Sequence, residues 1–82
     1  MQLDILTPEQ KVFSGEVESV QLPGAEGKFQ VLDNHAPMIA TINAGYVKIK
    51  SAAGKQEFKV KSGIVEVLKN HVSVLTEGLI TE

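Results

Sequence analysis

Apolar and polar residues alternate along much of the chain, with the period of two that is typical of strands buried on one face. In Gln56–Lys61, Phe58 and Val60 share one side and charged residues occupy the other. No segment shows the 3.6-residue period of a helix. Between glycines and other turn residues the pattern predicts nine short strands: Gln2–Thr7, Lys11–Phe13, Glu16–Leu22, Lys28–Leu32, Met38–Ile42, Tyr46–Lys50, Gln56–Lys61, Ile64–Leu68 and Val72–Leu75.

Two segments depart from the simple alternation. In Glu16–Leu22 the apolar positions change parity after Val17, so either both faces are partly buried or a bulge near Ser19 resets the register. The last residues, Thr76–Glu82, carry no signal for a partner strand, and we expect them to fray.

Many short strands at this spacing predict an all-β fold. Two sheets packed face to face bury the alternating apolar faces of such strands. The chain of 82 residues has the length of one domain and contains no repeat or linker. We therefore expect residues 1–82 to form a single two-sheet antiparallel β-sandwich.

The composition narrows the possible functions. The chain has no cysteine, which rules out disulfides and thiolate metal sites. It has a net charge of −2, eight lysines and no arginine, which argues against nucleic-acid binding. No apolar run approaches the roughly 18–20 residues of a membrane helix, and no secretion signal is apparent.

The residues that could carry catalysis or bind a metal are few and scattered. His35, His71 and Asp33 do not have the spacing of a metal site, and none of the five serines lies in a nucleophile-elbow sequence. Glu16 and Glu18 lie two apart, as on a solvated strand face. We expect no catalytic residue, no metal and no cofactor.

Lysines alternate in two of the predicted strands, at Lys48 and Lys50 and at Lys59 and Lys61. They could form a positive patch for an acidic protein partner. Exposed lysine rows are also ordinary solubilising surface that blunts edge pairing, and from the sequence we favour this second interpretation.

Residues 22–37 (LPGAEGKFQVLDNHAP) place turn residues between two apolar runs. Gly24 and Gly27 allow a sharp turn, and Pro37 stiffens the residues before it. Folding does not explain why Glu26 and His35 lie in these loops, and exposed polar loop residues often bind partners.

Residues 22–29 (LPGAEGKF) and 31–40 (VLDNHAPMIA) resemble the signature of the F-type ATP synthase epsilon subunit, called delta in mitochondria. Residues 7–17 and 63–75 resemble its opening strands and closing hairpin, so the resemblance is collinear over nearly the whole chain. It implies a ten-stranded β-sandwich in a non-catalytic rotor subunit of the central stalk. Lys28 and Gln30 depart from residues that are common in the family.

The resemblance also implies partners. The subunit would link the gamma subunit to the polar loops of the membrane c-ring within the F1 assembly, coupling proton flow to ATP synthesis. It would be present in one copy, peripheral to the cytoplasmic face of a bacterial membrane. The implied contact residues are Glu26, Gly27 and Lys28 for the c-ring, and His35, Ala36, Pro37, Met38 and Ile39 near gamma and the ring.

Family members usually continue into two C-terminal helices. No such residues follow Glu82, so we expect a short form that lacks the helical domain. A subunit clamped between partners should expose apolar side chains, and Met38 and Ile39 are candidates. The alternative is a stand-alone β-sandwich that binds a ligand or peptide, for which the four scattered aromatic residues are a poor basis.

Overall fold

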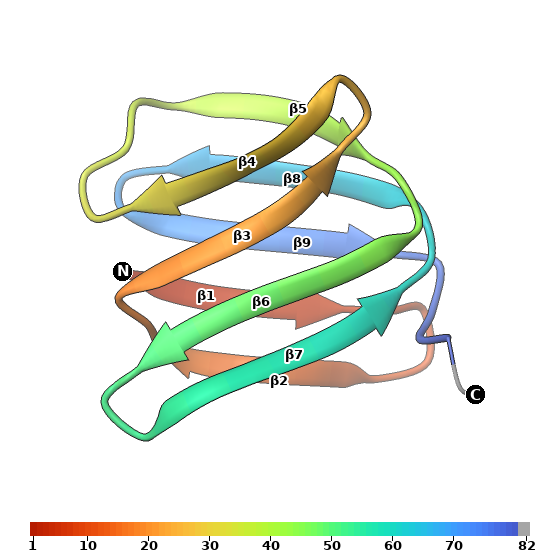
Figure 1. Ribbon diagram of the computed structural model, residues 1–82, viewed down its shortest axis with the longest axis horizontal. Helices are drawn as coiled ribbons and strands as arrows, with labels where there is room; N and C mark the ends of the chain where they lie inside the picture. Colours follow the sequence, from red (N-terminus) through yellow and green to blue (C-terminus); the bar gives the residue numbers. More distant parts are fainter. Residues whose placement is uncertain (81–82) are drawn as a thin grey trace.

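The computed structural model describes residues 1–80, which form nine strands and no helix (Figure 1). No described segment is therefore a helix able to cross a membrane. The strands are β1 (Gln2–Leu6), β2 (Lys11–Glu16), β3 (Ser19–Gly24), β4 (Gly27–Leu32), β5 (Met38–Ile42), β6 (Gly45–Ser51), β7 (Gly54–Val60), β8 (Gly63–Leu68) and β9 (His71–Thr76).

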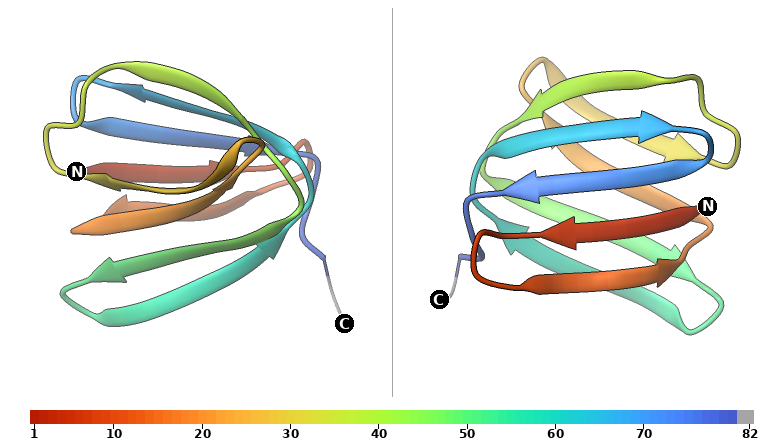
Figure 2. Two further views of the ribbon diagram at one scale, coloured as in Figure 1. Left: turned by 45° about the horizontal axis from the view of Figure 1, so that its top comes forward. Right: turned by 180° about the vertical axis from the view of Figure 1, so that it is seen from behind.

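The nine strands form one hydrogen-bonded sheet that curls into two layers. The strand order is β2-β1-β9-β8-β5-β3-β6-β7, with β4 added beside β3. The back layer consists of β5, β8, β9, β1 and β2, and the front layer of β4, β3, β6 and β7 (Figures 1 and 2). The layers join where Gly24 of β3 pairs with Ile42 of β5. This confirms the predicted all-β sandwich, but its two layers belong to one curled sheet and not to two separate sheets. Residues 1–80 form nine strands, where the family resemblance implied ten.

All strand pairs are antiparallel except one. β1 pairs in parallel with β9, in a register that places Ile5 opposite Val74. The first and last of the described strands thus lie side by side in the middle of the back layer (Figure 2).

The core lies between the two layers and consists mainly of β-branched and leucine side chains. Phe13 of β2 and Phe58 of β7 approach with ring centroids 6.0 Å apart, across the side where the two layers end. The buried apolar residues are Met1, Leu3, Ile5, Val17, Val20, Leu22, Val31, Ile42, Val47, Ile49, Val60, Val65, Val67, Val72 and Val74.

The parity change after Val17 has a different cause from those predicted. β2 ends at Glu16 and β3 begins at Ser19, and the two residues between them carry the chain from the back layer to the front layer. The Val17 N–H donates to the Met1 carbonyl, and the Glu18 N–H donates to the Lys50 carbonyl of the other layer. The apolar positions change parity because the chain passes from one layer to the other between β2 and β3. The interpretation as a bulge near Ser19 was therefore wrong.

The predicted fraying of the tail is wrong for Thr76–Ile80. Thr76 is buried at the end of β9, and its hydroxyl donates to the Lys61 carbonyl at 2.7 Å. The Ile80 N–H donates to the Lys59 carbonyl at 2.8 Å, and Leu79 forms an isolated bridge with Val60. The segment after β9 is therefore held against the end of β7; the rest of the predicted frayed tail, residues 81–82, lies outside the described residues.

Candidate functional site

The β3–β4 hairpin is a tight turn with Ala25 and Glu26 at its tip. Gly27 has a φ of 129°, a conformation that favours glycine. A Cβ at Gly24 would lie 2.5 Å from the Gly27 carbonyl oxygen, so the turn also needs glycine there. The Ala25 N–H donates to the Thr41 carbonyl at 3.0 Å, which fixes the turn to β5. The tip is thus rigidly placed while the Glu26 side chain stays exposed.

A groove of about 560 Å³ runs between β4 and β5, and we call it the edge groove. The predicted contact residues Glu26, Gly27 and Lys28 line it together with Met38 and Ile39. Ile39 is 71% exposed, more than any other large apolar side chain described, whereas Met38 is half-buried against the core. Five of the eight predicted contact residues therefore share one surface.

The other three predicted residues, His35, Ala36 and Pro37, do not join the hairpin tip. They lie in the β4–β5 loop at the opposite end of these strands (Figure 1). The His35 imidazole Nδ1 lies 2.7 Å from the Ala36 carbonyl oxygen, so one of the two ring nitrogens already has a hydrogen-bond partner within the loop. Pro37 lines a second, neighbouring groove with Ile39 and Leu68.

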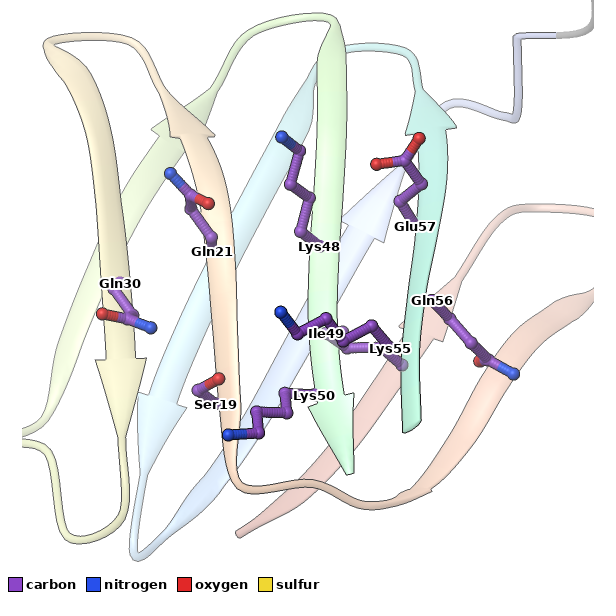
Figure 3. A pocket seen from close by; sticks show the side chains of 9 residues that line it. All are labelled: Ser19, Gln21, Gln30, Lys48, Ile49, Lys50, Lys55, Gln56 and Glu57. Carbon is purple, nitrogen blue, oxygen red and sulfur yellow. The ribbon is translucent and has the colours of Figure 1, made fainter. Parts of the chain in front are cut away.

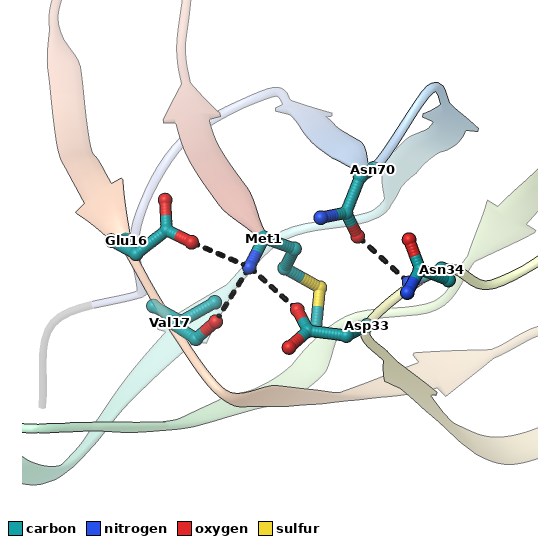
Figure 4. Close-up of polar contacts among 6 residues, drawn as sticks. All are labelled: Met1, Glu16, Val17, Asp33, Asn34 and Asn70. Carbon is teal, nitrogen blue, oxygen red and sulfur yellow. Dashed lines mark hydrogen bonds and ion pairs between the residues drawn. The ribbon is translucent and has the colours of Figure 1, made fainter.

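Polar contacts hold the start of this loop (Figure 4). The Met1 α-ammonium donates to Asp33 Oδ1 at 2.7 Å, to Glu16 Oε1 at 2.8 Å and to the Val17 carbonyl at 3.0 Å. The hydrogen bond that the ammonium donates to Asp33, and then the one to Glu16, raise the pKa of the Met1 α-amino group above its ordinary value of 8.0, although burial acts to lower it. Both loops near the predicted contact residues are thus tied to the sandwich.

The outer face of the back layer carries a row of apolar side chains that was not predicted from the sequence. Ile64 of β8 faces Leu75 of β9, which faces Leu6 of β1, and Pro8 lines the same groove. Ile64 and Leu75 are 49% and 52% exposed. We call Leu6, Pro8, Ile64 and Leu75 the apolar row. Its signal in the sequence was that apolar residues occupy both faces of β8 and β9, whose inward positions are valines.

A serine, a histidine and an aspartate also meet on the back layer. His71 Nε2 lies 2.6 Å from Asp4 Oδ2. The hydrogen bonds from Ser14 and then from His71 lower the pKa of Asp4, with burial opposing them. Since the hydroxyl and the imidazole both bind the carboxylate, this arrangement does not activate a nucleophile. Within residues 1–80, no three His, Asp or Glu side chains gather as metal ligands would.

Comparison with known families gives a match over the whole chain. The model of the family described as "ATP synthase, Delta/Epsilon chain, beta-sandwich domain" matches residues 1–82. A protein of Caulobacter vibrioides named ATP synthase epsilon chain is 40% identical over 77 residues, covering 94% of this chain and 90% of the relative.

Longer relatives carry the same name. The epsilon chain of Leptospira borgpetersenii is 38% identical, and the match covers 94% of this chain and 61% of the relative. That of Rhodopseudomonas palustris BisB5 is 43% identical, with coverages of 90% and 55%. The chain thus spans less than two thirds of the length of these two curated relatives.

Solved structures share the fold. A chain in the mitochondrial ATP synthase of Euglena gracilis (OSCP/F1/c-ring) superposes with a TM-score of 0.87 at 18% identity, covering 95% of this chain and 51% of that chain. A chain in the central stalk and c-ring of the Tetrahymena thermophila enzyme gives 0.82 at 14% identity, with coverages of 96% and 64%. At these identities the likeness concerns the β-sandwich itself.

Proposed function

The chain belongs to the β-sandwich family of ATP synthase delta and epsilon chains, and from this premise we propose that it is a non-catalytic central-stalk subunit of a proton-translocating F-type ATP synthase. In this role it links the gamma subunit to the polar loops of the c-ring and transmits torque between ion flow and ATP synthesis. It is present in one copy and is peripheral to the cytoplasmic face of a bacterial membrane, which it reaches through the complex.

The observation that carries this proposal is the exposure of apolar side chains in a domain that already has a full core. Ile64, Leu75 and Ile39 are about half exposed or more, although fifteen other apolar residues are buried. Ile64 and Leu75 lie side by side, and contiguous apolar surface of this kind is typical of a protein interface. A subunit clamped between partners would cover it in the assembly.

Two surfaces suit two partners. The apolar row, on the outer face of the back layer, suits a permanent contact with gamma, since lasting interfaces are the more apolar ones. The hairpin tip, with exposed Glu26 and Lys28, suits polar loops of the c-ring. Ile39 lies in the edge groove beside the tip and joins that contact, and residues 35–37 lie at the far end of the same two strands.

The test is association of the purified chain with recombinant gamma subunit and with purified c-ring from the same organism. We expect Leu75→Lys to abolish gamma binding, because it buries an unpaired charge in an apolar contact. Tyr46→Lys is the matched control: Tyr46 is also an exposed large residue, at 44%, but lies on the front layer. Failure of the unmodified chain to bind gamma, or equal loss in both variants, would contradict the proposal.

The c-ring contact is tested separately with Glu26→Lys. We expect this variant to keep its melting temperature, because an exposed loop acid contributes little to the core, and to bind a ring with basic loops less tightly. Glu57→Lys makes the same charge change on an exposed residue of β7. A large drop in melting temperature for Glu26→Lys would show instead that Glu26 is structural.

A further inference from the structure

We propose that the outer face of the front layer is a docking site for a carboxylate-rich segment of a protein partner, separate from the apolar row and the edge groove. We call it the basic face. It consists of the outward residues of β3, β6 and β7 together with Gln30 of β4, and its centre is a hollow of about 420 Å³ between these strands (Figure 3).

Charge is distributed very unevenly between the two layers. The front-layer strands contain five of the eight lysines but one of the ten acids, Glu57, although the chain as a whole is acidic. Four of the five lie on the basic face, namely Lys48, Lys50, Lys55 and Lys59; the fifth, Lys28, lines the edge groove. The back-layer strands contain a single lysine and three acids. A positive face on a negative protein directs acidic partners to that side.

The strand register places like charges side by side on this face, which lowers the stability of the domain. Lys50 of β6 stands directly opposite Lys55 of β7 on the outer face, and like charges in that position destabilise a sheet. Within residues 1–80, Lys48, Lys50 and Lys55 form no ion pair. An anion bound between Lys50 and Lys55 would remove this repulsion.

The hollow between these lysines has the groups that a carboxylate needs. Figure 3 shows the side chains of Lys48, Lys50 and Lys55 extending toward β3, where Ser19 and Gln21 lie. Ammonium groups supply the charge, while hydroxyl and amide groups supply directed hydrogen bonds. These neighbours come from register: Ser19 pairs with Lys50, and Gln21 with Lys48.

A protein segment fits the basic face better than a membrane surface does. The lysines surround a hollow, which a flexible acidic side chain can enter and a plane of lipid headgroups cannot. Glu57 stands opposite Lys48 on the same face, where it would repel a uniformly anionic surface. A flexible protein segment can place its carboxylates away from Glu57, so Glu57 limits only where the segment lies on this face.

The probe is a fluorescein-labelled decaglutamate peptide, with binding to the full chain followed by fluorescence anisotropy and by shifts of backbone amide NMR signals. We expect binding at low salt, shifts centred on β6 and β7, and strong weakening near 0.15 M salt, where the Debye length is about 8 Å. The double variant Lys50→Gln/Lys55→Gln should bind at least about tenfold more weakly. Lys11→Gln/Lys69→Gln removes the same charge from two exposed lysines elsewhere and should bind as the unmodified chain does.

A second measurement needs no partner. Because Lys50 and Lys55 repel each other, Lys55→Gln alone should raise the melting temperature. A peptide concentration that saturates the unmodified chain should then stabilise that chain more than it stabilises this variant. Equal loss of binding in both double variants would show charge attraction without a site and overturn the proposal. So would absence of peptide binding, or binding only to vesicles of phosphatidylcholine and phosphatidylserine, which would assign the face to a membrane. None of these results bears on the gamma and c-ring contacts, which involve other surfaces.

Discussion

Gly24 and Gly63 lie where two backbone segments pass too closely for a side chain. A Cβ at Gly63 would overlap the Leu75 carbonyl of the neighbouring strand, and one at Gly24 would meet the Gly27 carbonyl. Both positions fix the register of a hairpin that carries a proposed contact surface. Glycine in a sequence often marks a turn, but the close approach at these two positions is a property of strand pairing, which the residues of one strand do not specify.

Substitution of Gly63 tests this close approach. We expect Gly63→Ala to lower the free energy of unfolding by about 1–3 kcal/mol, because the added methyl forces the β8 and β9 backbones apart. Urea unfolding measures this loss. Gly78→Ala is the control, since its Cβ would meet only the Lys61 side chain at an ordinary distance of 3.7 Å. Equal effects at both sites would mean that glycine's backbone freedom, and not the contact, is decisive.

The lowered pKa of Asp4 predicts a pH dependence. The Ser14 and His71 hydrogen bonds favour the carboxylate, so their contribution is complete above about pH 4, the ordinary range of Asp, and is lost as pH falls through the lower folded pKa. We expect Asp4→Asn to lower the melting temperature at pH 6 and to flatten its decline below pH 4. Glu9→Gln, an exposed loop change, should leave the decline intact. A parallel decline in the Asp4→Asn variant would assign acid sensitivity to other groups.

At the scale of strands, the alternating pattern carried most of the prediction. Tyr46–Lys50 and Gln56–Lys61 were predicted within a residue or two of β6 and β7, because one face of each is buried and the other charged. The pattern could not separate a bulge from a change of layer at Val17, since both reverse the parity of the side chains. The tail after Thr76 was missed because backbone hydrogen bonds hold it, and these do not depend on side-chain type.

The β8–β9 turn offers a change that should stabilise the fold. Lys69 and Asn70 have φ values of 51° and 59°, as in the type I′ turn that favours two-residue hairpins. Asn70 suits this conformation, but Lys69 does not. We expect Lys69→Asn to raise the free energy of unfolding by about 0.5–1 kcal/mol, because asparagine tolerates the left-handed region. Lys11→Asn is the control, because it replaces an exposed lysine within β2 and should not raise the free energy of unfolding. Equal increases in both variants would mean that the loss of a lysine charge is the cause.

At the scale of the whole molecule, two layers share a single core, and each strand has one face in it. Val67 is 2% exposed, whereas its neighbour Leu68 is 48% exposed on the outer face. The alternating pattern predicted the burial of Val67, but it gave no reason for an exposed leucine at position 68. The outward leucine became informative once the register placed it on a surface with Ile39 and Pro37.

A pair of variants tests this difference between the inward and outward faces of β8. Val67→Asp should unfold the domain, because it places an unpaired carboxylate between the layers, at a cost of several kcal/mol. Leu68→Asp should fold, with a loss of about 1 kcal/mol at most. Circular dichroism and thermal melting distinguish the two. A folded Val67→Asp variant would mean that the core reorganises to hydrate the charge.

The predicted contact residues show how far a sequence can define a surface. Glu26, Gly27 and Lys28 were expected in an exposed turn; Glu26 lies at its tip and the other two begin β4 directly after it, all three lining a groove with Ile39. His35, Ala36 and Pro37 are close to them in sequence but lie at the other end of β4 and β5, since a strand separates the two loops. The predicted strand between the loops already implied this separation. The apolar row and the basic face, in contrast, follow from strand order, which the local pattern does not specify.

The parallel pairing of β1 with β9 bears on how the chain folds. His71 and Asp4, which meet across this pair, are 67 residues apart. Of the nine described strands, the apolar strand β1 therefore leaves the ribosome first and its central partner β9 leaves it last. Until then β1 has only β2 beside it, and the back layer remains split. High contact order of this kind slows folding and leaves strand edges open to aggregation. We infer that the β5–β8–β9 and β3–β4–β6–β7 units form early and that docking of β1 completes the domain.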